Sequence, residues 1–110
     1  MARQAKSWVV DFDSDAVIDF EDVKSRADRK AVFNVVQKLK DVGPDLPSPH
    51  MKSLKGRADL FELRPRQGAC EARPIYARLG QRFLVLAVAA KKKDFDRAVA
   101  AAEARLGRHR

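Results

Sequence analysis

The sequence predicts a domain of the α+β class, in which two N-terminal helices pack on one face of a small antiparallel sheet and a short helix ends the chain. Apolar side chains recur at helical spacing in two segments of the first half. Segments of strand-like alternation or continuous apolar character then fill residues 60–90, and a last helical pattern follows. We expect residues 1–110 to form a single domain, because a chain of this length can bury one modest core.

The first half of the chain is expected to form one strand and two helices. Residues 8–12 have the composition of a strand, and Ser14 is expected to cap the helix that follows, with Asp15 in its first turn. A polar break comes next, and Gly43 and Pro44 end the second helix, because glycine favours a left-handed stop and proline cannot continue the helix. The two apolar stripes are Ala16, Val17, Phe20 and Val23, then Val32, Val35, Val36 and Leu39.

A loop with two prolines is expected over residues 45–57, and a strand over residues 60–66. Residues 67–71 form a connection, and Arg73–Leu79 form the next strand. Pro74 indicates a sheet edge or a bulge there, because proline cannot donate to the hydrogen-bond ladder.

Gly80 and Gln81 are expected to form a tight turn into a nearly continuous apolar strand, which is typical of a covered, central position. That strand spans residues 82–90. Asp94 then caps a last helix that ends at Gly107. The sheet face away from the two N-terminal helices has no obvious cover except this last helix, and it could stay open as a concave basic surface.

The positive charge of the chain is concentrated in the segment that carries the expected sheet. Residues 50–93 hold eleven lysines and arginines against three acidic residues, so this segment nets +8, as does the whole chain. A sheet with an excess of one sign of charge indicates a polyanionic partner, and nucleic acid is the leading candidate.

Several classes of protein are excluded by composition. A single cysteine, Cys70, allows no internal disulfide, which suits a cytoplasmic protein. One cysteine and two histidines cannot build a familiar zinc site, and the five separated glycines form no phosphate-binding loop. The longest apolar run is far shorter than the roughly 20 residues of a membrane-spanning helix. We therefore expect no metal, no cofactor, no secretion signal and no membrane partner.

The ordered motifs of residues 50–93 resemble the RelE/HigB toxins of bacterial type II toxin–antitoxin systems, including their phage-derived members. The motifs are Lys52-x-Leu54-Lys55-Gly56, Leu60-Phe61-Glu62-Leu63-Arg64, Arg73-x-x-Tyr76 and Lys91-Lys92. The resemblance implies a RelE-like fold and a metal-independent endoribonuclease that cuts mRNA on the ribosome. It also implies a cognate antitoxin, typically a helix-turn-helix protein, through which alone the toxin would meet promoter DNA.

Two other functions stay open at this point. The apolar strand ends in Ala87-Val88-Ala89-Ala90, where the family often has a histidine and an aromatic residue before the lysines. The chain could therefore be a ParE-like toxin that acts on DNA gyrase without cutting RNA. It could also be a basic nucleic-acid-binding module without toxicity.

The candidate catalytic residues are two arginines, a tyrosine and a lysine. Arginine binds phosphate oxygens with two parallel hydrogen bonds and keeps its charge, which suits the stabilisation of a pentavalent phosphate. A tyrosine or lysine with a shifted pKa can move a proton. The set is Arg64, Arg73, Tyr76 and Lys92.

Structural alternatives stand beside these roles. Arg64 could pair with Glu62 or Glu71, and Tyr76 could simply pack in the core. Glu62 is expected to act as an ion-pair partner rather than as a base.

The candidate RNA-binding residues are the basic side chains around the catalytic set. Arg66 is expected to share a sheet face with Arg64, because side chains two apart on a strand point the same way. His50 has the best unperturbed pKa for proton transfer but lies in the loop. The set is His50, Lys52, Lys55, Arg66, Lys91 and Lys93.

Overall fold

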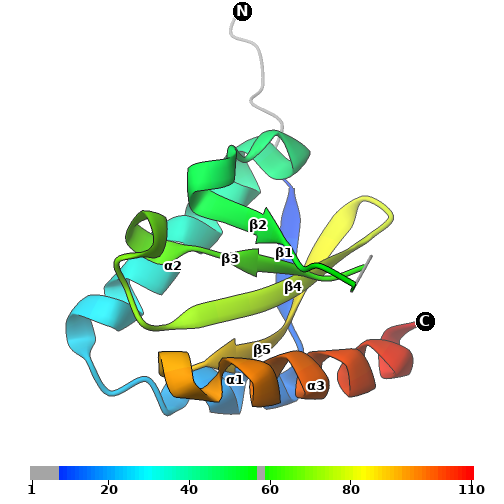
Figure 1. The fold of residues 1–110 in the computed structure, drawn as a ribbon. Coiled ribbons are helices and arrows are strands. Elements are labelled where there is room, and N and C mark those ends of the chain that lie inside the picture. Colours follow the sequence, from blue (N-terminus) through cyan, green and yellow to red (C-terminus); the bar gives the residue numbers. More distant parts are fainter. Residues whose placement is uncertain (1–7, 57–58) are drawn as a thin grey trace, which may run out of the picture.

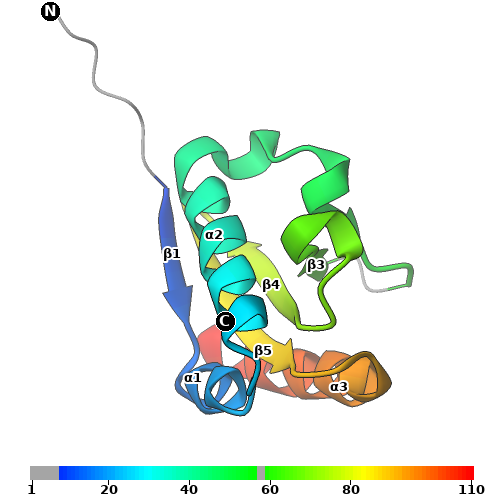
Figure 2. The ribbon, with the colours of Figure 1, turned by 90° about the vertical axis from the view of Figure 1, so that its left-hand side faces the viewer.

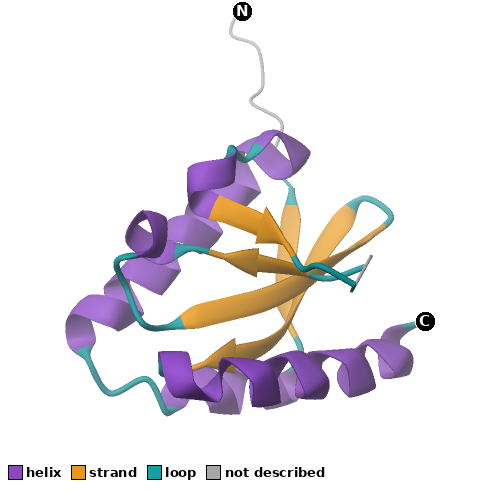
Figure 3. Cartoon of the chain, viewed as in Figure 1, coloured by secondary structure: helices purple, strands orange, loops and turns teal. Residues whose placement is uncertain are grey.

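The computed structural model describes residues 8–56 and 59–110 and contains one five-stranded sheet. The strands lie in the order β1-β5-β4-β3-β2 and are covered by helices on both faces (Figure 1 and Figure 3). The strands are β1 (Val9–Phe12), β2 (Met51–Ser53), β3 (Phe61–Leu63), β4 (Arg73–Leu79) and β5 (Arg82–Ala89). The helices are α1 (Ser14–Glu21), α2 (Arg26–Val42) and α3 (Phe95–Leu106).

The α+β class is confirmed, with one difference in the sheet. β2, β3, β4 and β5 pair antiparallel, as expected, but β1 pairs parallel with β5. A parallel pair needs a crossover connection, and α1, α2 and the strands β2–β4 lie between β1 and β5 in the sequence. The first strand therefore joins the far edge of the sheet, beside the last strand.

Apolar residues on the two sides of the sheet form separate cores. α2 packs its stripe of Val32, Val35, Val36 and Leu39 against one face of the sheet, and Ala16 of α1 belongs to the same cluster. α3 packs Ala98, Val99, Ala102 and Leu106 on the other face, against side chains of β4 and β5. Figure 1 shows α3 in front of the sheet and α2 behind it. The second face is therefore not open over β4 and β5.

The two longest strands form as the sequence predicted. β5 lies inside the sheet between β1 and β4 and is buried along seven of its eight residues, and β4 lies between β3 and β5. The register between β4 and β5 shifts between Ile75 and Tyr76, directly after Pro74, so the proline marks a bulge rather than an edge.

Three expectations about local structure are wrong. The loop at residues 45–57 contains the short strand β2, which pairs with β3. β3 ends at Leu63, and Pro65–Gly68 form a 3₁₀ helix, so Arg64 and Arg66 do not share a sheet face by strand alternation. The N-cap of α1 is Asp13 rather than Ser14, since the Asp13 carboxylate accepts the backbone N–H of Asp15.

β5 extends beyond the end of β1, and side chains form hydrogen bonds with its backbone there. The Asp19 carboxylate of α1 accepts the N–H of Val88 at 3.2 Å, and Arg105 of α3 donates to the carbonyl of Leu86 at 2.9 Å. Asp19 and Arg105 also bond to each other at 2.7 Å. This ion pair fastens α1 and α3 to the same strand.

The C-terminus is fastened to the start of α1. The buried Asp13 carboxylate receives hydrogen bonds from Arg108 at 2.9 Å and interacts with the His109 ring at 2.7 Å. Burial alone would raise the pKa of Asp13, but the hydrogen bonds from His109 and Arg108 outweigh it and lower the pKa to about 2. Within the described residues, no helix is long and apolar enough to cross a membrane.

Candidate nucleic-acid interface

Arg73 is held at the start of β4 by two acceptors. Its Nη1 donates to the Glu62 carboxylate at 2.8 Å, and its Nε donates to the carbonyl of Cys70 at 3.2 Å. Both side chains of this pair are largely buried, with 12% of Arg73 and 8% of Glu62 exposed. Glu62 and Ile75 are register partners on β3 and β4, so the sheet itself brings the pair together. Glu62 is an ion-pair partner, as expected, but its partner is Arg73 rather than Arg64.

Two lysines complete an open cleft around this pair. Lys92 and Lys93 lie in the turn before α3, and they line a cavity of about 330 Å³ with Glu62, Arg73, Phe95 and Asp96. The backbone N–H of Lys92 donates to the Glu71 carboxylate at 3.3 Å, which ties this turn to the connection before β4. The three predicted residues Arg73, Lys92 and Lys93 thus meet in one place, which we call the Arg73 cleft.

Lys52 lies on the strand next to this pair. It is the register partner of Glu62 across β2 and β3, and directly opposed residues project to the same side of a sheet. Its side chain is exposed. Lys55 and Lys91 are also exposed, but they line neither the Arg73 cleft nor the cleft beside α2, so their RNA-binding roles stay predictions.

His50 and Arg66 lie in a second cleft, on the side of α2. This cleft has a volume of about 520 Å³ and is lined from α2 by Ala31, Asn34, Val35, Gln37 and Lys38. His50 ends a short 3₁₀ helix, Ser48–His50. The backbone N–H of Arg64 donates to the carbonyl of His50 at 2.8 Å, which places the end of this helix beside the start of the 3₁₀ helix Pro65–Gly68. Five of the ten predicted residues therefore lie in two separate clefts: Arg73, Lys92 and Lys93 line one, and His50 and Arg66 line the other.

Arg64 lies at the junction of β3 and the 3₁₀ helix that follows. Its side chain is half-buried, and its Nε is a buried polar atom without a hydrogen-bond partner among the described residues. It lines neither cleft, so its catalytic role stays a prediction.

Tyr76 lies in the core on the α2 side of the sheet and is only 3% exposed. Its ring stacks on Phe61 at 5.4 Å and meets the edge of Phe83 at 5.9 Å. Burial raises the pKa of Tyr76 to about 12. This packing favours the structural alternative, and the hydroxyl would have to become exposed before it could move a proton for a substrate.

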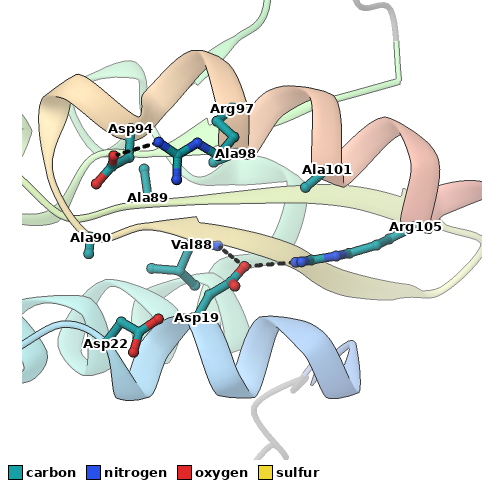
Figure 4. Close-up of a pocket in the computed structure, with 10 residues that line it drawn as sticks. All are labelled: Asp19, Asp22, Val88, Ala89, Ala90, Asp94, Arg97, Ala98, Ala101 and Arg105. Carbon is teal, nitrogen blue, oxygen red and sulfur yellow. Dashed lines mark hydrogen bonds and ion pairs between the residues drawn. The ribbon is translucent and has the colours of Figure 1, made fainter.

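A third hollow, of about 200 Å³, lies between α1 and α3 and is rich in charge, but its ionic groups are largely paired (Figure 4). Asp19 is bonded to Arg105, and Asp94 lies 3.7 Å from Arg97. Its carboxylates Asp19, Asp22 and Asp94 outnumber its two arginines, which disfavours an anionic ligand. Among the described residues, no group of three or more histidine, cysteine, aspartate or glutamate side chains is placed to hold a metal ion.

Comparison with known proteins identifies the family and the fold of the chain. The family described as "Phage derived protein Gp49-like (DUF891)" matches residues 20–110. The chain belongs to this Gp49-like family. A solved structure of a double mutant of the Escherichia coli toxin RelE in the free state is similar to it, with a TM-score of 0.69 and 17% sequence identity. The similarity covers 90% of this chain and 97% of the RelE chain, so the Gp49-like protein has the fold of RelE.

The predicted resemblance to RelE/HigB-type, phage-derived toxins is thereby confirmed. No curated protein matches the Gp49-like chain. Two features of the candidate interface went unpredicted: the pairing of Arg73 with Glu62, and the lining of the second cleft by Asn34 and Lys38 of α2. A polar residue on an exposed helix face gives no signal of its own in the sequence, because it is the expected occupant of such a position.

Proposed function

We propose that this Gp49-like protein is the toxin of a type II toxin–antitoxin system and cuts mRNA as a metal-independent endoribonuclease. The single observation that carries the proposal is the Arg73 cleft, where a fixed guanidinium and two exposed lysines share one open cavity. A preorganised cation is the main requirement for stabilising a phosphate that gains negative charge during cleavage.

Each group of the cleft has a role that its surroundings support. Arg73 binds the scissile phosphate, and Glu62 is a positioning residue that fixes the orientation of the guanidinium. The ribose 2′-hydroxyl loses its proton to solvent water as its oxygen attacks phosphorus, the bond to the 5′-oxygen breaks, and Lys92 donates a proton to that leaving oxygen. The products are a 2′,3′-cyclic phosphate and a 5′-hydroxyl. Lys52 and Lys93 bind the flanking backbone.

The comparison with the RelE toxin supports the same reading at the level of the fold. In this system a cognate antitoxin, expected to be a helix-turn-helix protein, neutralises the toxin and alone carries it to promoter DNA. The net charge of +8 favours an antitoxin whose contacting segment is acidic.

The experiment is expression of the Gp49-like protein in translating cells or extracts, with sequencing of RNA 5′ ends. We expect transcript cleavage and arrest of growth, and Arg73→Gln should lower cleavage by about 10²-fold or more, the typical effect of removing one charge-stabilising donor. Arg97→Gln is the matched control, because Arg97 is an exposed arginine of α3 outside the Arg73 cleft. Full cleavage by Arg73→Gln would refute the site.

One observation keeps a second function in view. No histidine lines the Arg73 cleft, since His50 lies in the other cleft and His109 contacts Asp13. A toxin that binds DNA gyrase without cutting RNA would need no proton donor. DNA breaks with intact transcripts in the same experiment would establish this alternative.

A further inference from the structure

The second cleft, which we call the α2 cleft, combines an apolar floor with hydrogen-bonding walls. Ala31 and Val35, both buried, contribute the floor from α2. Asn34 and Lys38 of α2 line it from the same helix, and His50 and Arg66 line it from the two 3₁₀ segments. Apolar side chains beside amide, imidazole and guanidinium groups offer the contacts that an unstacked nucleobase can use, with the guanidinium plane as the surface for stacking.

The polar groups of this cleft are available for a ligand. In the described part of the chain, most arginines bond to an acidic side chain, including Arg73, Arg82, Arg105, Arg108 and Arg110. The side chains of Arg66, His50, Asn34 and Lys38 make no hydrogen bond or ion pair with described residues. Within the described residues, the charge of Arg66 therefore faces the cleft without a paired carboxylate.

The backbone of Arg66 gives a second, independent observation. Its φ is +54°, and it is the non-glycine residue with a positive φ in the described part of the chain. The left-handed region is unfavourable for a residue with a Cβ atom, and such strained residues cluster at ligand sites. The strain here falls on the arginine that lines the α2 cleft.

The α2 cleft lies within reach of an RNA strand bound in the Arg73 cleft. His50 is two residues before Lys52, a separation of about 7 Å along an extended backbone. Lys52 is opposite Glu62, which holds Arg73. Figure 2 shows the 3₁₀ helix after β3 and the start of α3 on the same side of the molecule. Glu62 lies between Phe61 and Leu63, which pack on the α2 face, so the Arg73 cleft opens on the other face of the sheet. A single RNA strand that occupies both clefts would pass around the edge of the sheet at β2.

We propose that the α2 cleft is a nucleotide-binding subsite for the single-stranded RNA substrate, in which Asn34 reads the edge of one base. Arg66 and His50 bind its face or its phosphate, and Ala31 and Val35 support the ring. This inference rests on the proposed ribonuclease function and extends it, because it assigns sequence preference to a helix that does not contribute to the Arg73 cleft.

The test uses the full chain with short single-stranded RNAs whose 2′-hydroxyls are blocked by methylation, so that binding is measured without cleavage. We expect Arg66→Gly to weaken binding by about tenfold, the loss of one base or phosphate contact. Glycine adopts a positive φ freely, so the thermal unfolding midpoint should stay the same or rise. Arg97→Ala, which removes an exposed arginine outside both clefts, should bind as the unaltered protein does.

Asn34→Ala tests the reading of the base. We expect this variant to cut RNA at more sites, with the preference at one position near the cut reduced several-fold and the helix intact. Unchanged binding by Arg66→Gly together with an unchanged cleavage pattern for Asn34→Ala would overturn the subsite. If Arg73→Gln still abolishes cleavage in that case, the proposed function stands without it. If Arg73→Gln cleaves normally, the proposed function itself fails.

Discussion

Three arginines that are close in the sequence have three different surroundings, and these surroundings decide what each can do. Arg73 is fixed by Glu62 and the Cys70 carbonyl, so it presents a preorganised cation. Arg66 is exposed on a strained backbone. Arg64 has a buried Nε without an acceptor among the described residues, which costs stability unless another group compensates. Composition alone treats the three as equal.

The variant Tyr76→Phe distinguishes a structural role of Tyr76 from a catalytic one. We expect Tyr76→Phe to leave RNA cleavage within about twofold of the unaltered protein and to change the free energy of unfolding by less than about 1.5 kcal/mol, because the ring contacts remain and only a buried hydroxyl is lost. The measurements are cleavage rate and urea unfolding. A loss of cleavage with unchanged stability would restore Tyr76 to the catalytic set.

Asp13 makes stability depend on pH in the acid range. Its pKa is lowered to about 2, so the charged form stabilises the fold above pH 4, and this contribution is lost as the pH falls from about 4 towards 2. Asp13→Asn keeps a side-chain oxygen that can cap α1, but it removes the negative charge that interacts with Arg108 and His109. We expect this variant to lower the free energy of unfolding at pH 7 by about 2 kcal/mol. We also expect its free energy of unfolding to depend less on pH below about pH 4.

Urea unfolding at a series of pH values checks this effect. Asp15→Asn is the control, because Asp15 also bonds to Arg108 but is 43% exposed, and we expect it to cost less than about 1 kcal/mol. Equal acid dependence in the Asp13→Asn variant and the unaltered protein would show that the stabilising charge lies elsewhere.

At the scale of the elements, the segments with a strong apolar pattern were predicted well. α2 has its predicted stripe and its predicted end at Gly43, and β4 has its predicted bounds. β2 and β3 have three residues each, which is too short for an alternating pattern to be recognised. For that reason β2 was not predicted, and β3 was predicted too long. The prediction therefore placed Arg66 on a strand, whereas the structure places it in the 3₁₀ helix Pro65–Gly68.

The end of α2 depends on a glycine for two separate reasons. Gly43 has a φ of +57°, and a Cβ atom added there would lie 2.4 Å from the Trp8 ring. We expect Gly43→Ala to lower the free energy of unfolding by about 2–4 kcal/mol, the sum of left-handed strain and overpacking. Gly80→Ala is the matched control, with a φ of +63° and open space, and should cost about 1 kcal/mol.

Thermal or urea unfolding of the two glycine variants measures the difference. Both positions have a positive φ, but Gly43 also has a ψ of −127°, so the difference between the variants reports the contact with Trp8 together with this glycine-specific conformation. Equal losses in the two variants would mean that the indole moves aside without cost.

At the scale of the whole molecule, the sequence located the positive charge but not its division between two clefts. The pairing of Arg73 with Glu62 depends on the register of β3 and β4, and the α2 cleft depends on how a helix lies beside segments far along the chain. Neither relation is visible in local patterns, because it arises from long-range packing. The fold class was predictable, whereas the arrangement of the site required the structure.

The positions of the basic residues in and beside the two clefts lead to a quantitative prediction for the salt dependence of RNA binding. If one strand contacts Lys52, Arg66, Arg73, Lys92 and Lys93, the logarithm of the binding constant should fall with the logarithm of salt concentration with a slope of roughly −3.5, about −0.7 for each phosphate neutralised on a single strand. Lys93→Gln should reduce the steepness by about 0.7. Lys40→Gln removes the same charge near β1, outside both clefts, and should leave the slope unchanged although the net charge falls equally. Fluorescence anisotropy across a salt series with non-cleavable RNA provides the measurement. If the two lysine variants changed the slope equally, binding would follow the net charge of the molecule, and the two clefts would not form the path of the strand.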